Sequence, residues 1–563
     1  MIRAIGRHPQ SAGRRRWSLP ILAALAALIL ASSAAPTLAQ PAQEAADNMT
    51  TVIERFEPPP RRPPSVGVTV DADVLGIPAG QLDTIRFRLT AIDLVGAESV
   101  PTDQLAALWR GMIGREISLA DLRDVLDGIA EVYRQNDYYG LAIAPPQDFS
   151  DGRIEVRVYE AYIREVVIVG DYPGLAERLD PYIARIVAMD PVRISRLERY
   201  LLLMADLAGV TIDALLSKIP DEPGAGKLEL TVGFDRQVIA GRVDNFGNDE
   251  TGPLTASMTA RFNDLFGQFE GTDFLAVTNP LEPDELVFLR LSQIYQLGPS
   301  GFAAGYEIGQ VWSNPGGDLA ALDVHAETTI GKVHLDYAFM RRIQRSLIGS
   351  LALNTKNVAV DIGELPATRE YNRWVTAGAT YDDVIAGAAL IIEVAVAQGL
   401  DDLGSTGEDA DFRFVSFDGS LGRDLTETVT AGLRFTGQKA LTPLPSAVKF
   451  DVGGENYGRA FDGGTITGED GVAAALEIGK RIDTGVAWLQ GFTIFAFGDY
   501  GAVWNDPGVA PYEFAALGSY GGGIRSRLGR HGSVAAYVAA PWINTAKGTD
   551  PGVRFRFTAG VRY

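Results

Sequence analysis

The stretch that decides the fold of this chain is VRFRFTAGVRY, at residues 553–563. Its odd positions carry apolar side chains, and its even positions carry arginine, threonine or glycine. Strict alternation is the period of a β-strand, because neighbouring side chains point to opposite faces. Three arginines on one face require water or carboxylates, whereas the other face suits lipid. The stretch therefore predicts a strand between a polar interior and a membrane.

The same alternation recurs upstream, at residues 254–263, 302–309 and 333–339. Ten residues with one apolar face match the length of a strand that crosses a bilayer. At roughly 20 residues per strand and connection, residues 237–563 allow about 16 antiparallel strands. A closed sheet leaves no unpaired edge in lipid, so we expect a transmembrane β-barrel. A soluble β-sandwich also alternates, but the polar second face and the length of this region argue against it.

A glycine-rich stretch, GGENYGRAFD at residues 453–462, interrupts the strand pattern. It places Arg459 between Tyr457 and Phe461 in a loop that cannot build a core of its own. Asp499 is the best candidate partner, because a shielded guanidinium and carboxylate attract strongly and can pair in bidentate fashion. We predict a loop that folds into the barrel and is latched to its wall through these four residues. The alternative, that Arg459 only fills the lumen and stabilises the barrel, stays open.

Two small α/β domains are predicted before the barrel, at residues 80–160 and 161–236. Each has a strand, two helical patterns and a closing strand. In the first, Ser118 stands three residues before Asp121, which predicts a helix cap. Two copies of about 75 residues indicate an internal repeat of one domain type.

These domains and the barrel resemble the outer-membrane transporters of two-partner secretion, the haemolysin/filamentous-haemagglutinin secretion and activation protein family. The resemblance rests on Tyr138-Tyr139, Pro146-Gln147-Asp148, Gly152, Val158-Tyr159-Glu160 and Pro223-Gly224, and in the barrel on Asp244-Asn245, Gly437-Gln438, Gly453-Gly454 and the arginine loop. It implies two periplasmic POTRA domains before a 16-stranded barrel in the outer membrane. It also implies that an unfolded partner protein of adhesin or haemolysin type is bound at the POTRA sheet edges and moved to the cell surface.

The loop departs from the pattern of the family at two positions. Relatives carry a Val-Arg-Gly-Tyr/Phe motif whose arginine meets the aspartate of a Phe-x-Asp motif, and Arg459 and Asp499 occupy those places. Gly458 stands where valine is usual, and Ala460 where glycine is usual. The resemblance implies that the latch persists with altered backbone freedom at its tip.

The N-terminal 79 residues are predicted to hold a signal and a connecting segment. Residues 1–39 contain five arginines, no acidic residue and an apolar run at 19–31, which predicts a cleaved secretory signal peptide. A membrane anchor is the alternative, but the run is shorter than the roughly 20 residues that a spanning helix needs. Residues 40–79 are predicted to connect the signal to the first domain. Within them, residues 43–56 form either an amphipathic helix, which would plug the pore, or a disordered N-terminus. A proline-rich linker follows.

Composition excludes several classes of function. Removing the five arginines of the signal takes the formal charge from −21 to −26, which argues against a nucleic-acid partner. There is no cysteine, so disulfides and thiolate metal sites are excluded. His325 and His334 are expected to be polar residues facing the lumen. No catalytic pattern is present, and we expect neither an enzyme nor a cofactor nor a metal. The expected partners are a secreted client and outer-membrane lipid, with the barrel acting as a monomer.

Two other functions stay open. An outer-membrane protein assembly factor shares the arginine loop, but such proteins usually carry three or more POTRA domains, and this chain has room for two. A porin or polysaccharide exporter would need neither the two periplasmic domains nor the arginine loop.

Overall fold

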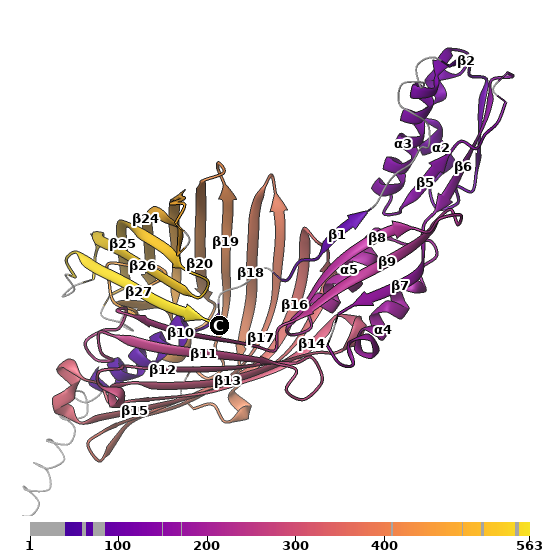
Figure 1. Ribbon diagram of the computed structural model, residues 1–563. Helices are drawn as coiled ribbons and strands as arrows, with labels where there is room; N and C mark the ends of the chain where they lie inside the picture. The colour runs from indigo at the N-terminus through magenta and orange to yellow at the C-terminus, as the bar shows by residue number, and fades with distance from the viewer. Residues whose placement is uncertain are drawn as a thin grey trace, which may run out of the picture.

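The computed structural model describes residues 40–58, 63–70, 85–148, 150–170, 172–406, 409–486, 488–507, 512–546 and 551–563. The predicted signal peptide lies outside these residues. Along the chain come a helix, two small α/β units and a barrel (Figure 1). No helix among the described residues is long and apolar enough to cross a membrane.

Residues from Gln237 onward form a closed barrel of 16 strands, each antiparallel to its neighbour. The strands are β10 (Gln237–Asp244), β11 (Thr255–Asn263), β12 (Gly271–Thr278), β13 (Val287–Gln296), β14 (Phe302–Ser313), β15 (Val324–Arg341), β16 (Arg345–Ile362), β17 (Leu365–Ile385), β18 (Ala388–Gly399), β19 (Arg413–Asp424), β20 (Val429–Ala440), β23 (Asp470–Ile482), β24 (Leu489–Trp504), β25 (Phe514–Leu528), β26 (Gly532–Asn544) and β27 (Arg554–Arg562). The predicted barrel is confirmed, and β27 closes it against β10.

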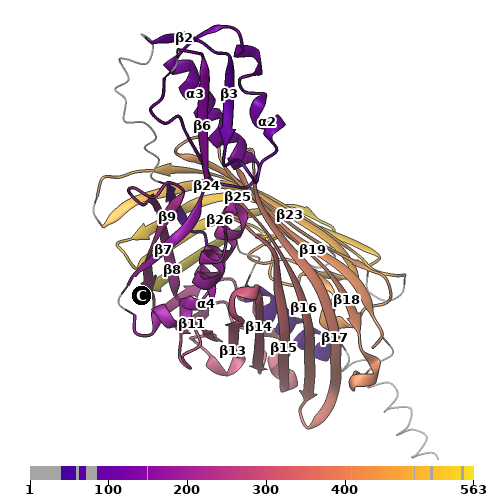
Figure 2. The same cartoon turned by 90° about the vertical axis from the view of Figure 1, so that its right-hand side faces the viewer.

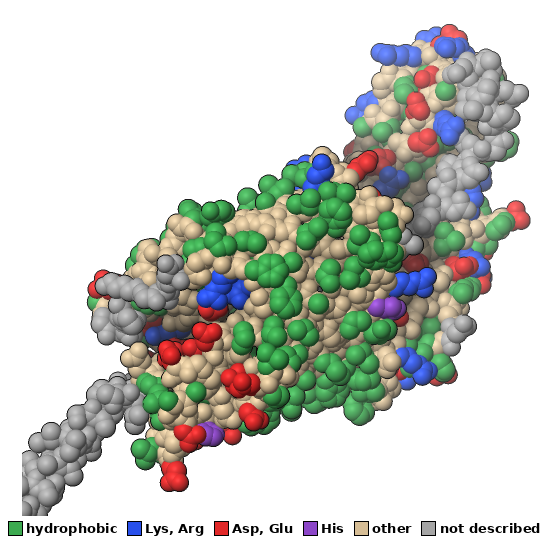
Figure 3. Space-filling view, turned by 60° about the vertical axis from the view of Figure 1, so that its left-hand side comes forward, with side chains coloured by type: hydrophobic (Ala, Val, Ile, Leu, Met, Phe, Trp, Pro, Cys, Tyr) green, Lys and Arg blue, Asp and Glu red, His purple; other side chains and the backbone are tan. Residues whose placement is uncertain are grey.

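The two faces of the wall differ as the alternation predicts. On β27, Phe555 is 60% exposed on the outside, whereas Arg556 is 3% exposed in the interior. Apolar side chains spread over the outer wall, and charged side chains gather toward its two ends (Figure 3). His334 lines the lumen, where its Nδ1 lies 3.0 Å from Asp336. The expectation for His325 is wrong: the pleat of β15 exposes it on the opposite face, because its neighbour Val324 is the residue that packs inward.

The first α/β unit packs one long helix against a small sheet. Its elements are β2 (Arg86–Arg88), β3 (Ala91–Val95), α2 (Thr102–Ala106), β4 (Glu116–Ser118), α3 (Leu119–Gln135), β5 (Gly140–Ile143) and β6 (Arg153–Glu160). Its main sheet has the order β3-β6-β5. The predicted cap is confirmed: Ser118 Oγ accepts a hydrogen bond from the Asp121 amide at 3.2 Å, and Asp121 accepts one from the Ser118 amide at 2.8 Å.

A partly buried acid ties this unit together. Glu160, at the end of β6, accepts hydrogen bonds from the Ser99 hydroxyl at 2.6 Å and the Tyr133 hydroxyl at 2.8 Å. Burial acts to raise the pKa of Glu160, but the hydrogen bonds from Ser99 and Tyr133 outweigh it and hold the pKa below the ordinary value of a glutamate. The carboxylate therefore stays ionised and joins a loop and α3 to the sheet.

The second unit repeats the topology of the first. It contains β7 (Tyr162–Val169), α4 (Leu175–Val187), α5 (Ile194–Ala205), β8 (Val210–Lys218) and β9 (Ala225–Phe234). In the main sheet of each unit, the strand that comes first in the chain is parallel to the last, and the last is antiparallel to the strand before it. The sequence pattern missed this middle strand in both units, β5 and β8.

A strand from the N-terminal segment completes the second sheet. Strand β1 (Gly67–Val70) lies parallel to β8, which gives the order β1-β8-β9-β7. The sequence predicted only a linker here, because four residues are too short for a periodic pattern. β1 covers the edge of β8 that corresponds to the outer edge of β5 in the first unit.

The second unit sits on the periplasmic turns of the barrel, and the first extends away from it (Figure 2). Arg341, at the end of β15, donates to Asp206 at 2.7 Å and to the carbonyl of Pro64 at 2.6 Å. Asp264, in the turn after β11, accepts from the Tyr172 hydroxyl at 2.6 Å and from Arg178 at 2.7 Å. Charge-assisted hydrogen bonds therefore fix this unit to the rim.

Candidate functional site

Two segments occupy the lumen of the barrel, a helix and a loop. Residues 40–55 are helical, so this segment has the helix and not the disordered alternative. The luminal loop, residues 441–469, connects β20 to β23. Within it, β21 (Phe450–Val452) and β22 (Ile466–Gly468) form a short hairpin that carries the tip, residues 453–465.

The helix packs against one side of the wall through small side chains. Ala42, Ala45, Ala46 and Met49 are all buried. They contact apolar residues on the inner face of β12 to β16, among them Leu275, Phe288, Val311, Ala326 and Val358. Small residues let the helix backbone approach the wall closely, and the apolar contact removes both surfaces from water.

The four residues predicted to form the latch lie within or beside the tip. Arg459 is 5% exposed, and its guanidinium carbon lies 4.1 Å from the centroid of the Phe497 ring. Its Nη1 is 3.3 Å from Glu477, whereas its Nε is 3.8 Å from Asp499 Oδ2. Arg459 and Asp499 are therefore neighbours, but the distance is too long for a hydrogen bond.

Asp499 binds the loop through its backbone instead. It accepts a hydrogen bond from the Gly458 amide at 2.8 Å and another from the Ser519 hydroxyl. Gly458 has φ +78°, a left-handed conformation that glycine adopts freely and β-branched residues avoid. The departure from valine at this position thus has a structural reason: the glycine turns its amide toward Asp499.

The aromatic residues and Ala460 have different surroundings. Phe461 and Ala460 are fully buried in an apolar cluster with Phe497. Tyr457 borders the cavity described below, and the centroid of its ring lies 6.0 Å from the guanidinium carbon of Arg434. Tyr457 is therefore the member of the predicted set that faces open space.

The sequence reasoning missed two acidic residues of the tip, Glu455 and Asp462. Glu455 binds Arg242 of β10 at 2.8 Å, and Asp462 binds Arg554 of β27 at 2.6 Å. The arginines on the polar face of β27 indicated that carboxylates lie near them, but the sequence pattern did not identify these carboxylates.

The helix meets the loop at its C-terminal end. Arg55 donates to Asp244 of β10 at 2.5 Å, and its Nε lies 3.5 Å from Glu455. A Cβ atom on Gly463 or Gly464 would come within 2.4 Å or 2.5 Å of Thr51, so the tip needs glycine where the helix passes. This close approach explains the glycines at positions 463 and 464.

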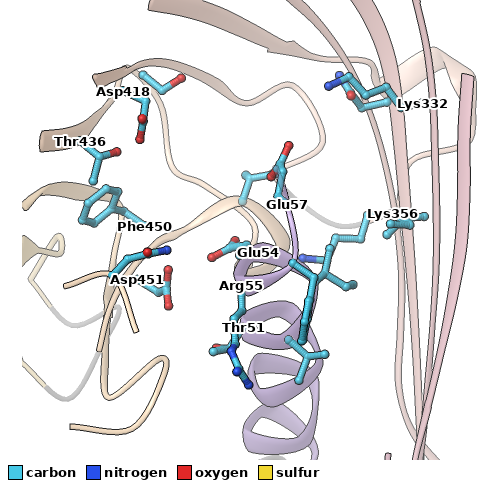
Figure 4. A pocket seen from close by; sticks show the side chains of 18 of the residues that line it. Thr51, Glu54, Arg55, Glu57, Lys332, Lys356, Asp418, Thr436, Phe450 and Asp451 are labelled. Atoms are coloured by element: carbon cyan, nitrogen blue, oxygen red, sulfur yellow. The ribbon is translucent and has the colours of Figure 1, made fainter. Parts of the chain in front are cut away.

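A cavity of about 820 Å³ lies between the C-terminal part of the helix, the loop and the barrel wall. Its lining is charged and includes Glu57, Glu307, Glu393, Asp418, Lys332 and Lys356. Glu54 on the helix and Asp451 on the loop point toward one another, and Lys356 comes from the opposite wall (Figure 4). Charged side chains from the helix, the loop and the wall thus face one space in the lumen, beside apolar ones such as Phe56 and Trp374.

Comparison with known families assigns this architecture. A model of the ShlB-type POTRA domain matches residues 87–161. A model described as haemolysin secretion/activation protein ShlB/FhaC/HecB matches residues 235–526, just over half of the chain. The chain belongs to this family. The prediction of a two-partner secretion transporter is thereby confirmed, and so are the predictions of an outer-membrane barrel with periplasmic POTRA domains and of a protein that is not an enzyme.

The chain is also similar to individual proteins and solved structures. The heme/hemopexin transporter protein HuxB of Haemophilus influenzae (strain 86-028NP) is 26% identical over 191 residues, which are 32% of this chain and 33% of that protein. The match thus spans about a third of the relative. CdiB from Escherichia coli has a TM-score of 0.71 at 14% identity, and CdiB from Acinetobacter baumannii 0.63 at 15%. Each covers 94% of this chain and 99% of the other, which shows a shared fold.

Proposed function

We propose that this chain carries an unfolded secreted protein from the periplasm through its barrel to the cell surface. One observation supports the proposal most directly. The helix that fills the lumen is joined through residues 56–66 to β1, which lies on the sheet edge of a periplasmic α/β unit. A protein that arrives at that edge is therefore connected to the segment that occupies the pore.

The client is bound by strand addition at the POTRA sheet edges. An extended segment pairs there through backbone hydrogen bonds, with little demand on its sequence. In the part of the chain that the structure describes, the outer edge of β5 has no strand partner, and the corresponding edge of β8 is covered by β1. A client segment therefore pairs first with β5 and then competes with β1 for β8.

Displacement of β1 would free the chain that leads to the helix. The helix must leave before an extended polypeptide can pass, because Ala42 to Met49 fill the space beside β12 to β16. Folding of the client outside the cell then makes its movement irreversible. Adhesin or haemolysin as the type of client, contact with outer-membrane lipid, and action as a monomer are finer parts of the same proposal.

The test begins with the neighbouring reading frame, which should encode a large exported protein. Deletion of the gene for the chain should remove that protein from the cell surface while other outer-membrane barrels assemble normally. If the exported protein stays at the surface and barrel assembly fails instead, the chain is an assembly factor. If neither changes but uptake of small solutes falls, it is a porin.

A further inference from the structure

The shortest ion pair of the tip is not the one that the family motif predicts. Asp462 accepts two hydrogen bonds from Arg554, at 2.6 and 2.7 Å, and a third from Arg556 at 3.2 Å. Arg556 also donates to the carbonyl of Phe461 at 3.3 Å. A bidentate pair with a second guanidinium fixes both the position and the orientation of a carboxylate.

This contact lies beside the seam where the barrel closes. Strands β10 and β27 are paired at five positions, from Ala240 to Asp244, and Ile239 exchanges two further backbone hydrogen bonds with Tyr563, whereas β10 and β11 are paired at eight positions. At the other end of the seam, the Asn245 side chain adds to the backbone contact: it donates to the carbonyl of Phe555 at 2.9 Å and accepts from the Phe557 amide at 2.7 Å. The seam is therefore shorter than the neighbouring strand pair, and side chains extend it.

The tip is held on both sides of that seam. On the β10 side, both carboxylate oxygens of Glu455 lie 2.8 Å from Arg242 Nη2. On the β27 side, Asp462 holds Arg554 and Arg556. Residues 455–462 thus bridge the first and last strands from inside the lumen.

We propose that Asp462 is a positioning residue of the transporter, and that with Arg554 and Arg556 it forms a second anchor that holds the loop tip across the barrel seam. The inference rests on the proposed function, because it identifies the contact that keeps the tip in place while the helix leaves the lumen. The Arg459–Asp499 contact, at 3.8 Å, lacks the direct hydrogen bonds that this anchor has.

The anchor can be tested by the protection of a single thiol. The natural chain has no cysteine, and Ala460 is 0% exposed in the tip, so Ala460→Cys places a unique thiol that is protected while the tip is held. The purified full-length protein in detergent is treated with a small water-soluble maleimide. Asp462→Asn, added to Ala460→Cys, should speed labelling at least tenfold, which corresponds to about 1.4 kcal/mol.

Matched variants separate the anchor from general damage. Arg554→Gln should give the same acceleration, and combining it with Asp462→Asn should add little, because both remove one interaction. Asp411→Asn removes a solvent-exposed aspartate that lies 3.2 Å from Arg413, and should leave the rate unchanged. If Asp462→Asn does not fold into a barrel, as judged by circular dichroism, the labelling rate of Arg554→Gln tests the anchor by itself.

The proposal is overturned if both anchor variants label at the rate of the parent while Arg459→Gln labels faster. The measurement contains no client, so its result is independent of transport. Protection that behaves as expected in a chain that secretes nothing would reject the proposed function and keep the anchor.

Discussion

The helix and the loop tip fill the same lumen, but they are held in different ways. The helix contacts the wall mainly through alanines and Met49, and it continues at its C-terminal end into the segment that leads to β1. The tip is anchored at both ends by strands and binds β23, β24, β27 and β10 through charged or backbone groups. Apolar contacts between small residues have no fixed geometry, whereas hydrogen-bonded ion pairs do. This difference supports the proposal that the helix leaves the lumen during transport while the tip stays in place.

Breaking the attachment of the tip should have the largest effect. Arg459→Ala and Asp499→Ala should each reduce secretion of the partner protein to background while the barrel still inserts. Both side chains are almost fully buried, and removing one charge from a fully buried pair costs roughly 3 to 5 kcal/mol, because the other is left uncompensated. The measurement is the amount of partner protein at the cell surface. Normal export by both variants would show that the contact does not serve transport.

Breaking the attachment of the helix should open the pore instead. Ala45→Glu puts a carboxylate against the apolar wall, where an unpaired charge costs several kcal/mol, so the helix should leave the lumen. Single-channel recordings in planar bilayers should then show a long-lived open state. Glu44→Gln is the matched control, because Glu44 is exposed on the same turn. A closed pore in Ala45→Glu would mean that the helix is not the element that blocks it.

The contact between the two segments should have the smallest effect. Arg55 shares Asp244 and Glu455 with Arg242, which stays in place when Arg55 is removed. Arg55→Ala should therefore raise the frequency of brief openings by about tenfold or less, since hydrogen bonds to charged groups contribute about 1.5 to 3 kcal/mol each and part is retained by Arg242. Arg55→Lys keeps the charge and should resemble the parent. If Arg55→Ala opens the pore as much as Ala45→Glu does, Arg55 makes the main contact that keeps the helix in the lumen.

Much of the fold could be predicted from local patterns. The alternation in residues 254–263 and 553–563 predicted β11 and β27, and Ser118 with Asp121 predicted the start of α3. These features depend on neighbours within a few residues. Strands β5 and β8 were missed because the patterns of the flanking helices and closing strands dominated the same segments. His325 was misplaced because it lies nine residues from His334 on the same strand, and an odd spacing puts two side chains on opposite faces of a sheet.

The candidate site was predicted in part. The glycine-rich stretch predicted a loop that carries Arg459 and Phe461, and Asp499 was the candidate partner of the arginine. It did not predict that the Gly458 amide, and not the guanidinium, makes the hydrogen bond to Asp499. Backbone direction at a glycine is set by the whole loop, because glycine allows both signs of φ.

The sequence by itself determined that this chain is a barrel with two preceding α/β units and an arginine loop, since periodicity, length and glycine content are local properties of the chain. Only the tertiary structure decided that β1 joins β8 more than 140 residues away, that the helix rests on β12 to β16, and that Asp462 meets Arg554 across the seam. These contacts join segments that are distant in sequence, and which of many arginines and carboxylates meet depends on how the closed barrel and its register bring them together.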